Sequence, residues 1–510
     1  MRKAILLLSA IFALVLTALC QTPANPPQVT FLDPVPQLLS GSRVTTNVNT
    51  LATKGRVVQG VGADGATEMV LRIPADGVGE QFTLTVINDS GMQSTSAAED
   101  GGLGAIGTTS FTASQMTVTA VNTSSGAFAF AIYGAPVDFP RPEGQDAGST
   151  TRSISIQALA LDTNLSTNAP VTILRSPLVL VHGLWGSASD WADFTPLIGD
   201  PRFSINEANY GTIVGSQIKS YKPNFPSWAL SSLKNTPASA LGFSYNATTV
   251  LQQINAFINN FKSGTNPANA PVAAVQADIL AHSMGGDITR TLPSLKPFYG
   301  NPTFTLGYVH KVITIATPYW GSPLAIHLLD KNNLCVRGVL ALSGSPSFTS
   351  VTFKNGTTVS GGVGDLQGDG FDGSLSPALQ ALQNPILHPM PTALIQGLES
   401  QTQLDGLDTS SVAASIRLLC LGDYLAGHLT SKGWPQIFNQ DSDSIVPALS
   451  AVAGLTDFTA VQGVIHSVSS EELGFGPPAE LDAAGNIPGV AIDLLNTPVT
   501  DSTYIPLPQQ

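Results

Sequence analysis

Residues 277–290, ADILAHSMGGDITR, decide the fold that we expect for most of this chain. The stretch starts as an apolar strand, reaches Ser283 among small residues and continues as a helix. A residue at such a sharp strand-to-helix turn has a strained backbone and holds its side chain clear of the sheet. Residues two positions away crowd the turn and must be small, as Ala281 and Gly285 are. Backbone N–H groups at the start of the helix would favour a developing oxyanion beside the serine.

From about residue 173 onward, short apolar runs alternate with longer segments of helical periodicity. The runs are SPLVLVHG, AVQADILA, HKVITIATP, PTALIQG and TAVQGVIH. In SYNATTVLQQINAFINNFK, the apolar side chains of Val250, Ile254, Phe257, Ile258 and Phe261 share one helical face. This alternation predicts a mostly parallel sheet with helices on both faces, an α/β domain over residues 173–510. The rhythm breaks over about 322–435, where the Gly-rich SGGVGDLQGDGFDGSLSP predicts an insertion over one end of the sheet.

The region before residue 173 has a different pattern, with apolar residues at every second position. In EQFTLTVINDSG, Phe82, Leu84 and Val86 share one face, and QMTVTAVNTSSGAFAFAIYG repeats the pattern across a turn. No convincing amphipathic helix occurs between about residues 28 and 172. We therefore predict an all-β, sandwich-like N-terminal domain over 21–172. A spacer or packing role is favoured over a specific binding role for it.

The first 20 residues have the layout of a secretory signal, with Arg2 and Lys3 followed by an apolar run, so we expect a secreted or extracytoplasmic protein. Cys20 leaves a lipoprotein anchor as the alternative.

Without the first 20 residues, the chain has 20 Lys and Arg and 35 Asp and Glu, a formal charge of −15. This charge argues against nucleic acid or anionic membrane surfaces as partners. Cys335 and Cys420 remain as an even pair, either a disulfide or two buried thiols.

The stretch AHSMGG resembles the nucleophile elbow of the α/β-hydrolase family, whose usual form is G-x-S-x-G. Ala281 replaces the first glycine, as in some bacterial lipases. About 100 residues earlier, LVLVHGLWGSASDW resembles the His-Gly-x loop of the family. ITIATPYWGSPLA, SLSPALQALQN and PTALIQGL also look lipase-like in their order. The resemblance implies an α/β-hydrolase fold, Ser283 as nucleophile, and an oxyanion hole formed by the backbone N–H groups of Leu184 and Met284.

A serine hydroxyl needs a base to take its proton and an acid to orient the base. In this family the order along the chain is Ser, then Asp or Glu, then His. DSDSIVP resembles the acid loop of the family and selects Asp443, with Asp441 as the rival. TAVQGVIH ends in His466, 23 residues after Asp443, and this residue is the implied base. The rival histidines all precede Asp443 and are interpreted as core or lid packing: His310, His327, His388 and His428.

The remaining polar candidates receive structural interpretations. His282 adjoins the serine but should point elsewhere, and His182 should brace the oxyanion loop. Asp365, Asp369 and Asp372 match no EF-hand spacing and are interpreted as solvated turns rather than a calcium site. No CxxC or HExxH spacing occurs, so neither a metal nor a cofactor is predicted.

Taken together, the resemblance implies a secreted lipase or carboxylesterase that acts on acyl esters through an acyl-enzyme, with the 322–435 insertion as a mobile lid. Such a protein would have no stable membrane insertion after signal removal. An extracellular polyester depolymerase, with the β domain as a surface binder, is the alternative among enzymes. A non-catalytic surface-binding protein with a hydrolase-like domain is the alternative outside them.

Overall fold

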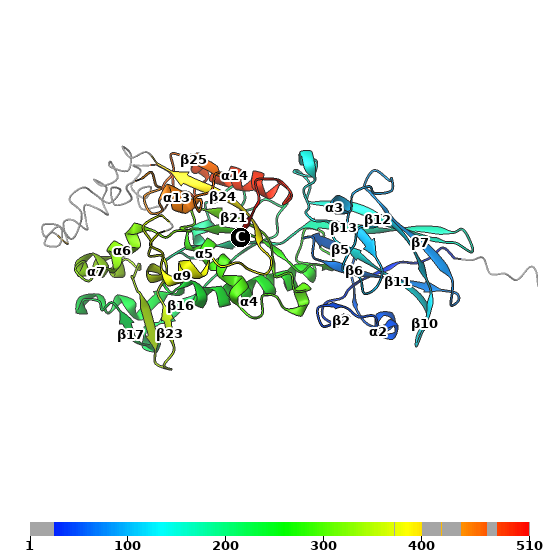
Figure 1. The fold of residues 1–510 in the computed structure, drawn as a ribbon, viewed down its shortest axis with the longest axis horizontal. Coiled ribbons are helices and arrows are strands. Elements are labelled where there is room, and N and C mark those ends of the chain that lie inside the picture. The colour runs from blue at the N-terminus through cyan, green and yellow to red at the C-terminus, as the bar shows by residue number, and fades with distance from the viewer. Residues whose placement is uncertain (1–24, 372, 400–419, 421–439, 467–476, 509–510) are drawn as a thin grey trace, which may run out of the picture. The chain divides into compact units, whose positions relative to one another are not determined.

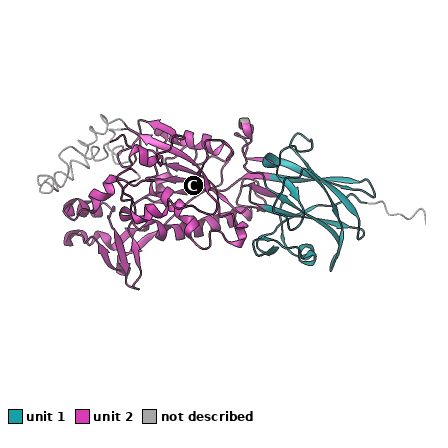
Figure 2. Ribbon diagram, in the orientation of Figure 1, with its two compact units in different colours: residues 1–59, 68–135, 153–172 teal, residues 60–67, 136–152, 173–510 magenta. Residues whose placement is uncertain are grey.

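The computed structural model describes residues 25–371, 373–399, 420, 440–466 and 477–508 (Figure 1). The expected signal segment and Cys20 therefore lie outside the described residues. The chain forms two compact units, a smaller one of residues 1–59, 68–135 and 153–172 and a larger one of residues 60–67, 136–152 and 173–510 (Figure 2). Two short segments that precede residue 173 thus belong to the larger unit.

The smaller unit is built from antiparallel strands. One sheet has the order β10 (Val121–Thr123), β11 (Gly126–Gly134), β6 (Glu68–Ala75), β1 (Thr30–Asp33) and β4 (Arg56–Val57), with β8 (Gly102–Gly104) also paired to β11. A second sheet contains β13 (Ser166–Arg175), β12 (Thr151–Ala160), β7 (Gln81–Ile87) and β9 (Gln115–Thr119), and β2 (Leu39–Ser40) pairs with β3 (Arg43–Val44).

The predicted alternation is present in this unit, because Phe82, Leu84 and Val86 of β7 are all buried. Two short helices, α2 (Val48–Thr53) and α3 (Ala97–Asp100), were not expected. Asn47 explains the first of them, since its side chain accepts hydrogen bonds from the N–H groups of Asn49 and Thr50. A helix this short has too few turns to display an amphipathic period.

The larger unit contains the predicted parallel sheet. Its order is β15 (Ile205–Glu207), β14 (Leu178–Val181), β20 (Ala277–His282), β21 (Val309–Ile315), β24 (Met390–Leu398) and β25 (Thr459–Gln462), and β26 (Ile505–Leu507) pairs antiparallel with β24. All neighbours from β15 to β25 are parallel. Each of the five apolar runs singled out in the sequence forms one of these strands, which confirms the predicted α/β fold.

Both faces of the sheet are covered, and successive strand residues belong to different cores. Val179 and Val181 of β14 join one core, whereas Leu178 and Leu180 join the other. Helices α4 (Phe243–Lys262) and α5 (Met284–Thr291) cover the first face and α14 (Ile487–Leu495) covers the second (Figure 1). The five apolar residues predicted for one face of α4 are all buried. Burial on both faces explains why these strands are continuously apolar.

The strand order places a topological switch beside β14. The chain runs from β14 to β15 on one side and then returns to β20 on the other side of β14. In open parallel sheets, ligands bind beyond the carboxyl ends of the strands at such a switch. The loop after β14 and Ser283 after β20 both lie there.

The predicted insertion needs a corrected boundary. Its described part contains α6 (Pro323–Leu329), α7 (Leu334–Leu342), β22 (Ser350–Phe353), β23 (Thr358–Ser360), α8 (Gly362–Asp365) and α9 (Pro377–Ala381), and β22 pairs with β17 (Ile218–Lys222). Strand β24 of the central sheet also falls within 322–435, so the segment is not one continuous insertion. Residues 400–419 and 421–435 lie outside the described residues.

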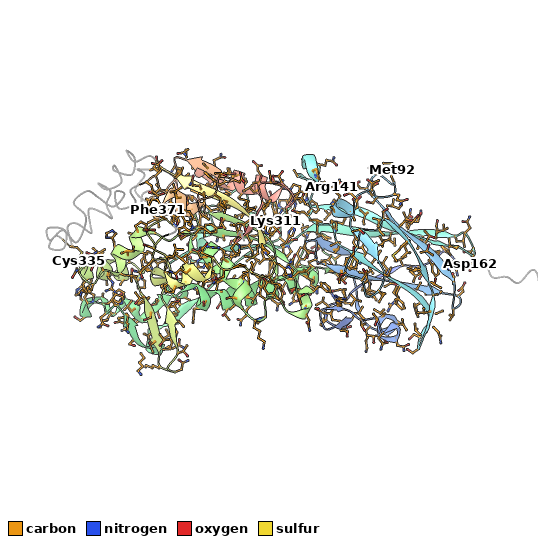
Figure 3. All side chains as sticks on the ribbon, in the orientation of Figure 1. Met92, Arg141, Asp162, Lys311, Cys335 and Phe371 are labelled. Atoms are coloured by element: carbon orange, nitrogen blue, oxygen red, sulfur yellow. A yellow bond between two sulfur atoms is a disulfide. The ribbon has the colours of Figure 1, made fainter. Side chains whose placement is uncertain are left out.

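Cys335 of α7 is joined by a disulfide to Cys420 (Figure 3), which selects the disulfide over two buried thiols. The remaining elements of the larger unit are β5 (Gly60–Ala63), β16 (Thr212–Val214), β18 (Asn235–Pro237), β19 (Val272–Ala273) and α13 (Ala448–Ala451). Within the described residues, no helix combines the length and apolar character needed to cross a membrane.

Candidate active site

Ser283 occupies the sharp turn between β20 and α5, as the sequence predicts. Its backbone has φ 56° and ψ −135°, a conformation that costs a residue with a side chain about 1–3 kcal/mol. The Ser283 N–H donates to the Ile315 carbonyl at 2.9 Å, and its carbonyl accepts from the Gly286 N–H at 3.0 Å and from Thr317 Oγ1 at 3.1 Å. These contacts hold the strained turn in place.

Small residues around the turn are required by close packing. A Cβ added to Gly285 would lie against the Val181 carbonyl oxygen, and one added to Gly286 would lie against the Thr317 side chain. Ala281 is completely buried. The helix can therefore begin directly above the sheet only with glycine at 285 and 286.

The structure brings Ser283, His466 and Asp443 into one hydrogen-bonded row. His466 Nε2 lies 2.8 Å from Ser283 Oγ, and His466 Nδ1 lies 2.8 Å from Asp443 Oδ2. Asp443 Oδ1 accepts the N–H groups of Ile445 and Val446 at 2.8 and 2.7 Å, which leaves Oδ2 facing the imidazole. All three side chains are buried. This row has the geometry that a nucleophile, a base and an orienting acid require.

The rival acid lies apart from this row. Asp441 is exposed, and its main-chain carbonyl accepts the Ala448 N–H at 2.8 Å. The acid loop is also tied to the loop that follows β21, because Ser322 Oγ donates to the Ile445 carbonyl and Ser450 Oγ donates to the Gly321 carbonyl.

The loop after β14 lies against the serine. A Cβ on Gly183 would be 2.6 Å from Ser283 Cβ and 2.9 Å from Ser283 Oγ. The side chains of Leu184 and Met284 converge as well, since a Cβ on Gly362 would meet Leu184 Cδ1 at 2.6 Å and Met284 Sδ at 3.0 Å. Met284 is the first residue of α5, so its N–H has no acceptor within the helix.

His182 lies at the base of this loop. Its Nδ1 is 3.2 Å from the Gly183 carbonyl oxygen. Its ring centroid is 4.0 Å from that of Tyr210, with the two rings tilted by 30°, and the Tyr210 hydroxyl donates to the His182 carbonyl. Burial lowers the pKa of His182 to about 4, so the ring is neutral near pH 7. These contacts fit a bracing role.

A second carboxylate, which the sequence analysis did not single out, lies beside the row. Glu480 is completely buried, and its Oε2 is 3.3 Å from His466 Nδ1 and 3.0 Å from His282 Nε2. Glu480 lies in none of the motifs quoted in the sequence analysis, and it follows a segment outside the described residues. His282 was expected to point elsewhere, and this expectation was wrong: its ring centroid is 4.6 Å from that of His466. The strand ends at Ser283, where φ is positive. The alternation of side chains along a strand therefore does not keep His282 away from His466, the partner of Ser283.

The charges in this cluster shift one another strongly. Burial opposes protonation of His466, but Asp443 and Glu480 outweigh it and raise the pKa of His466 to about 10. Burial, assisted by the charge of Glu480, raises the pKa of Asp443 to about 6. Burial would also raise the pKa of Glu480, but hydrogen bonds with His282 and His466 outweigh it and hold that pKa at about 2.

Among the described residues, His282, His466 and Glu480 form the one group of three potential metal ligands that lie close together. The nearest donor atoms of His282, His466 and Glu480 all lie within 4.8 Å of one another. These atoms already hydrogen-bond to each other, so we interpret the group as a charge network of side chains.

Other sequence candidates take structural positions. Asp369 accepts the Phe371 N–H at 2.9 Å in a turn, but Asp365 is buried rather than solvated, because its Oδ2 accepts the Phe243 N–H at the start of α4. His310 is buried and pairs with Asp278 at 2.7 Å. Asp372 and His428 lie outside the described residues.

One family model matches part of the larger unit. Residues 177–336, which hold β14, the loop after it and the turn at Ser283, match the family model described as "Putative serine esterase (DUF676)". The parallel sheet and the strand–turn–helix at Ser283 give the larger unit the α/β-hydrolase fold that the sequence predicts. The match covers the elbow and the loop after β14 but ends before the acid and the histidine.

Several solved structures are distantly similar to this chain. A mature Bacillus licheniformis lipase is 14% identical over 63% of this chain and 92% of its own, with a TM-score of 0.34. Phospholipase PlaB from Legionella pneumophila is 12% identical over 64% and 61%, with a TM-score of 0.38. An extracellular α/β-hydrolase from a Paenibacillus species is 11% identical over 64% and 100%, with a TM-score of 0.29. No curated protein matches the sequence.

Proposed function

We propose that this hydrolase cleaves carboxylic esters, with Ser283 as nucleophile, His466 as general base and Asp443 as the acid that orients it. The observation that carries the proposal is the position of His466, whose two ring nitrogens each lie 2.8 Å from one of the other two side chains. The serine esterase description of residues 177–336 supports the same chemistry.

In the proposed reaction, Ser283 Oγ attacks the ester carbonyl while His466 Nε2 takes its proton. The N–H groups of Leu184 and Met284 stabilise the oxyanion of the tetrahedral intermediate. His466 then gives the proton to the leaving alcohol, and water releases the acyl group from Ser283 by the same steps. Every step uses side chains or main-chain groups of this chain.

The proposed mechanism predicts activity at alkaline pH. His466 acts as a base only when its ring is neutral, and the two neighbouring carboxylates raise its pKa to about 10. Lowering the pH through that pKa protonates the ring and removes the base. We therefore expect kcat/KM to rise with pH above neutrality.

For the substrate, we propose an acyl lipid or a similar apolar ester. The support is the apolar insertion beside the site. Gly362 of α8, in the insertion, lies close to the side chains of Leu184 and Met284. Trp185 Nε1 also donates to the carbonyl of Pro346, in the insertion, at 2.9 Å. An apolar lining of this kind suits an acyl chain.

We also propose export, because the Cys335–Cys420 disulfide is the type of bond that persists in oxidising compartments.

The test is hydrolysis of esters from two-carbon to long acyl chains, soluble and emulsified, by the wild type and by Ser283→Ala. We expect activity in the wild type, a loss to near background in the variant, and a preference for longer chains. A short-chain preference would contradict the lipid assignment. Activity retained by Ser283→Ala, or none in the wild type across the series, would contradict the proposed function.

A further inference from the structure

The pair formed by Glu480 and His282 is unusual beside a row that already contains an acid. Asp443 by itself satisfies His466 Nδ1, at 2.8 Å. Glu480 nevertheless brings a second carboxylate to the same nitrogen, at 3.3 Å, in a position fully shielded from water. A buried carboxylate is costly unless other groups hold it, so its surroundings should show what holds it there.

Both the main chain and the side chain of Glu480 are fixed. Its N–H donates at 2.9 Å to the carbonyl of Ile465, the residue directly before His466. Its other oxygen, Oε1, has no hydrogen-bond partner among the described residues, and a Cβ on Gly397 would lie against that oxygen. Only glycine at 397 leaves room for the carboxylate, so strand β24 has no side chain at the position where Glu480 packs against it.

His282 supplies the donor that holds Oε2. An ionised carboxylate only accepts hydrogen bonds, so the 3.0 Å contact requires the proton on His282 Nε2. Burial lowers the pKa of His282, which favours the neutral ring with that single tautomer. His282 therefore anchors the carboxylate without adding a positive charge beside His466.

We propose, on the basis of the proposed function, that Glu480 is a second orienting acid for His466, held in place by His282, and that it shares the Nδ1 proton with Asp443. Glu480 and His282 are positioning residues, because they act on the reaction only through His466. Two consequences follow. The second negative charge raises the pH at which kcat/KM falls on the acidic side of the pH profile. In addition, either carboxylate can partly replace the other in orienting the His466 ring.

The pH consequence depends on all the ionisable groups around the ring. The charged or titratable groups that face His466 or its neighbour His282 are Asp443, Glu480, His182 and Asp190. Asp190 acts on His282 and His182, whereas the charges that act on His466 are those of Asp443 and Glu480, so these two carboxylates set the pKa of the base.

The first experiment measures kcat/KM against pH for the wild type and Glu480→Gln. An opposite charge at this distance shifts a pKa by about 1–3 units. In Glu480→Gln, the acidic limb of the profile should therefore shift to a pH that is lower by about 1–3 units. Glu480→Asp, which keeps the charge, should return the limb toward the wild-type position. Asp278→Asn is the matched control, because it removes a buried carboxylate from another histidine, His310, on the same sheet. An acidic limb that stays in place in Glu480→Gln would overturn the proposal.

The second experiment removes Asp443. In a triad where no other carboxylate can replace the acid, loss of the acid lowers kcat by about 10⁴-fold. We expect Asp443→Asn to lose at least tenfold less than that, and the double variant Asp443→Asn/Glu480→Gln to reach the full loss. If Glu480→Gln fails to fold, Asp443→Asn still decides the question, since a full 10⁴-fold loss in this single variant would overturn the proposal.

A third readout needs no turnover. The pKa of His466 can be measured by NMR on Ser283→Ala protein with labelled histidines, assigned with His466→Gln. Glu480→Gln in that background should lower this pKa by about 1–3 units, and an unchanged value would overturn the proposal. This titration tests Glu480 even if the wild type hydrolyses no ester, so failure of the inference and failure of the proposed function give different results.

Discussion

Replacing Gly183 by alanine should lower the activity strongly without unfolding the protein. The added Cβ would lie 2.6 Å from Ser283 Cβ, where ordinary van der Waals contact begins at 3.4 Å, so the loop or the serine must move by about 0.8 Å. Ser283 cannot move freely, because its main chain is held by hydrogen bonds with Ile315 and Thr317. A displacement of about 1 Å in an active site can lower the rate about 10²-fold.

The assay compares kcat and thermal stability of Gly183→Ala with those of Gly373→Ala. Gly373 is the matched control, since a Cβ there would meet nothing within 4 Å. We expect kcat to fall about 10²-fold in Gly183→Ala, with a stability cost of about 1–3 kcal/mol from overpacking. Wild-type kcat in a folded Gly183→Ala protein would refute the idea that this loop works in contact with Ser283.

Two further predictions concern stability. Lys311, labelled in Figure 3, is almost completely buried, and its Nζ lies 2.8 Å from Asp138 Oδ2. Lys311→Met should therefore lower the free energy of unfolding by about 3–5 kcal/mol, because it leaves a buried carboxylate without its partner. Denaturant unfolding measures this, and a change of only about 0.5 kcal/mol, as at a surface site, would contradict it. The Cys335–Cys420 bridge closes a separation of 85 residues, so replacing both cysteines by serine should lower stability by about 4 kcal/mol. Alkylation of the unreduced, denatured protein should modify neither cysteine, and modification of both would show that the bridge is absent.

The sequence predicted those parts of the fold that follow from local periodicity. The apolar runs formed the strands of the parallel sheet, and the spacing of Val250, Ile254 and Phe257 correctly gave one buried face of α4. The order of Ser283, Asp443 and His466 along the chain also selected three residues that the structure brings together. These patterns are readable because each depends on residues close in sequence or on a recurring order of elements.

Other features depend on contacts between distant segments, and the sequence carried no local signal for them. Glu480 reaches His282 across 198 positions, and the fixed turn at Ser283 decides that they meet. Asp365 is buried because it caps the N-terminus of α4, a helix 122 positions earlier in the chain. Strand β24 was recognised as apolar, but the glycine-rich segment before it obscured where the insertion ends.

The most direct test of the account is covalent labelling of the nucleophile. A fluorophosphonate reacts with a serine whose proton is removed by a neighbouring base, and the modified residue is identified by peptide mass spectrometry. The account predicts a single adduct on Ser283, none in Ser283→Ala and a much slower reaction in His466→Gln. An adduct on another residue, or equal labelling rates in the wild type and His466→Gln, would contradict the assignment of Ser283 and His466.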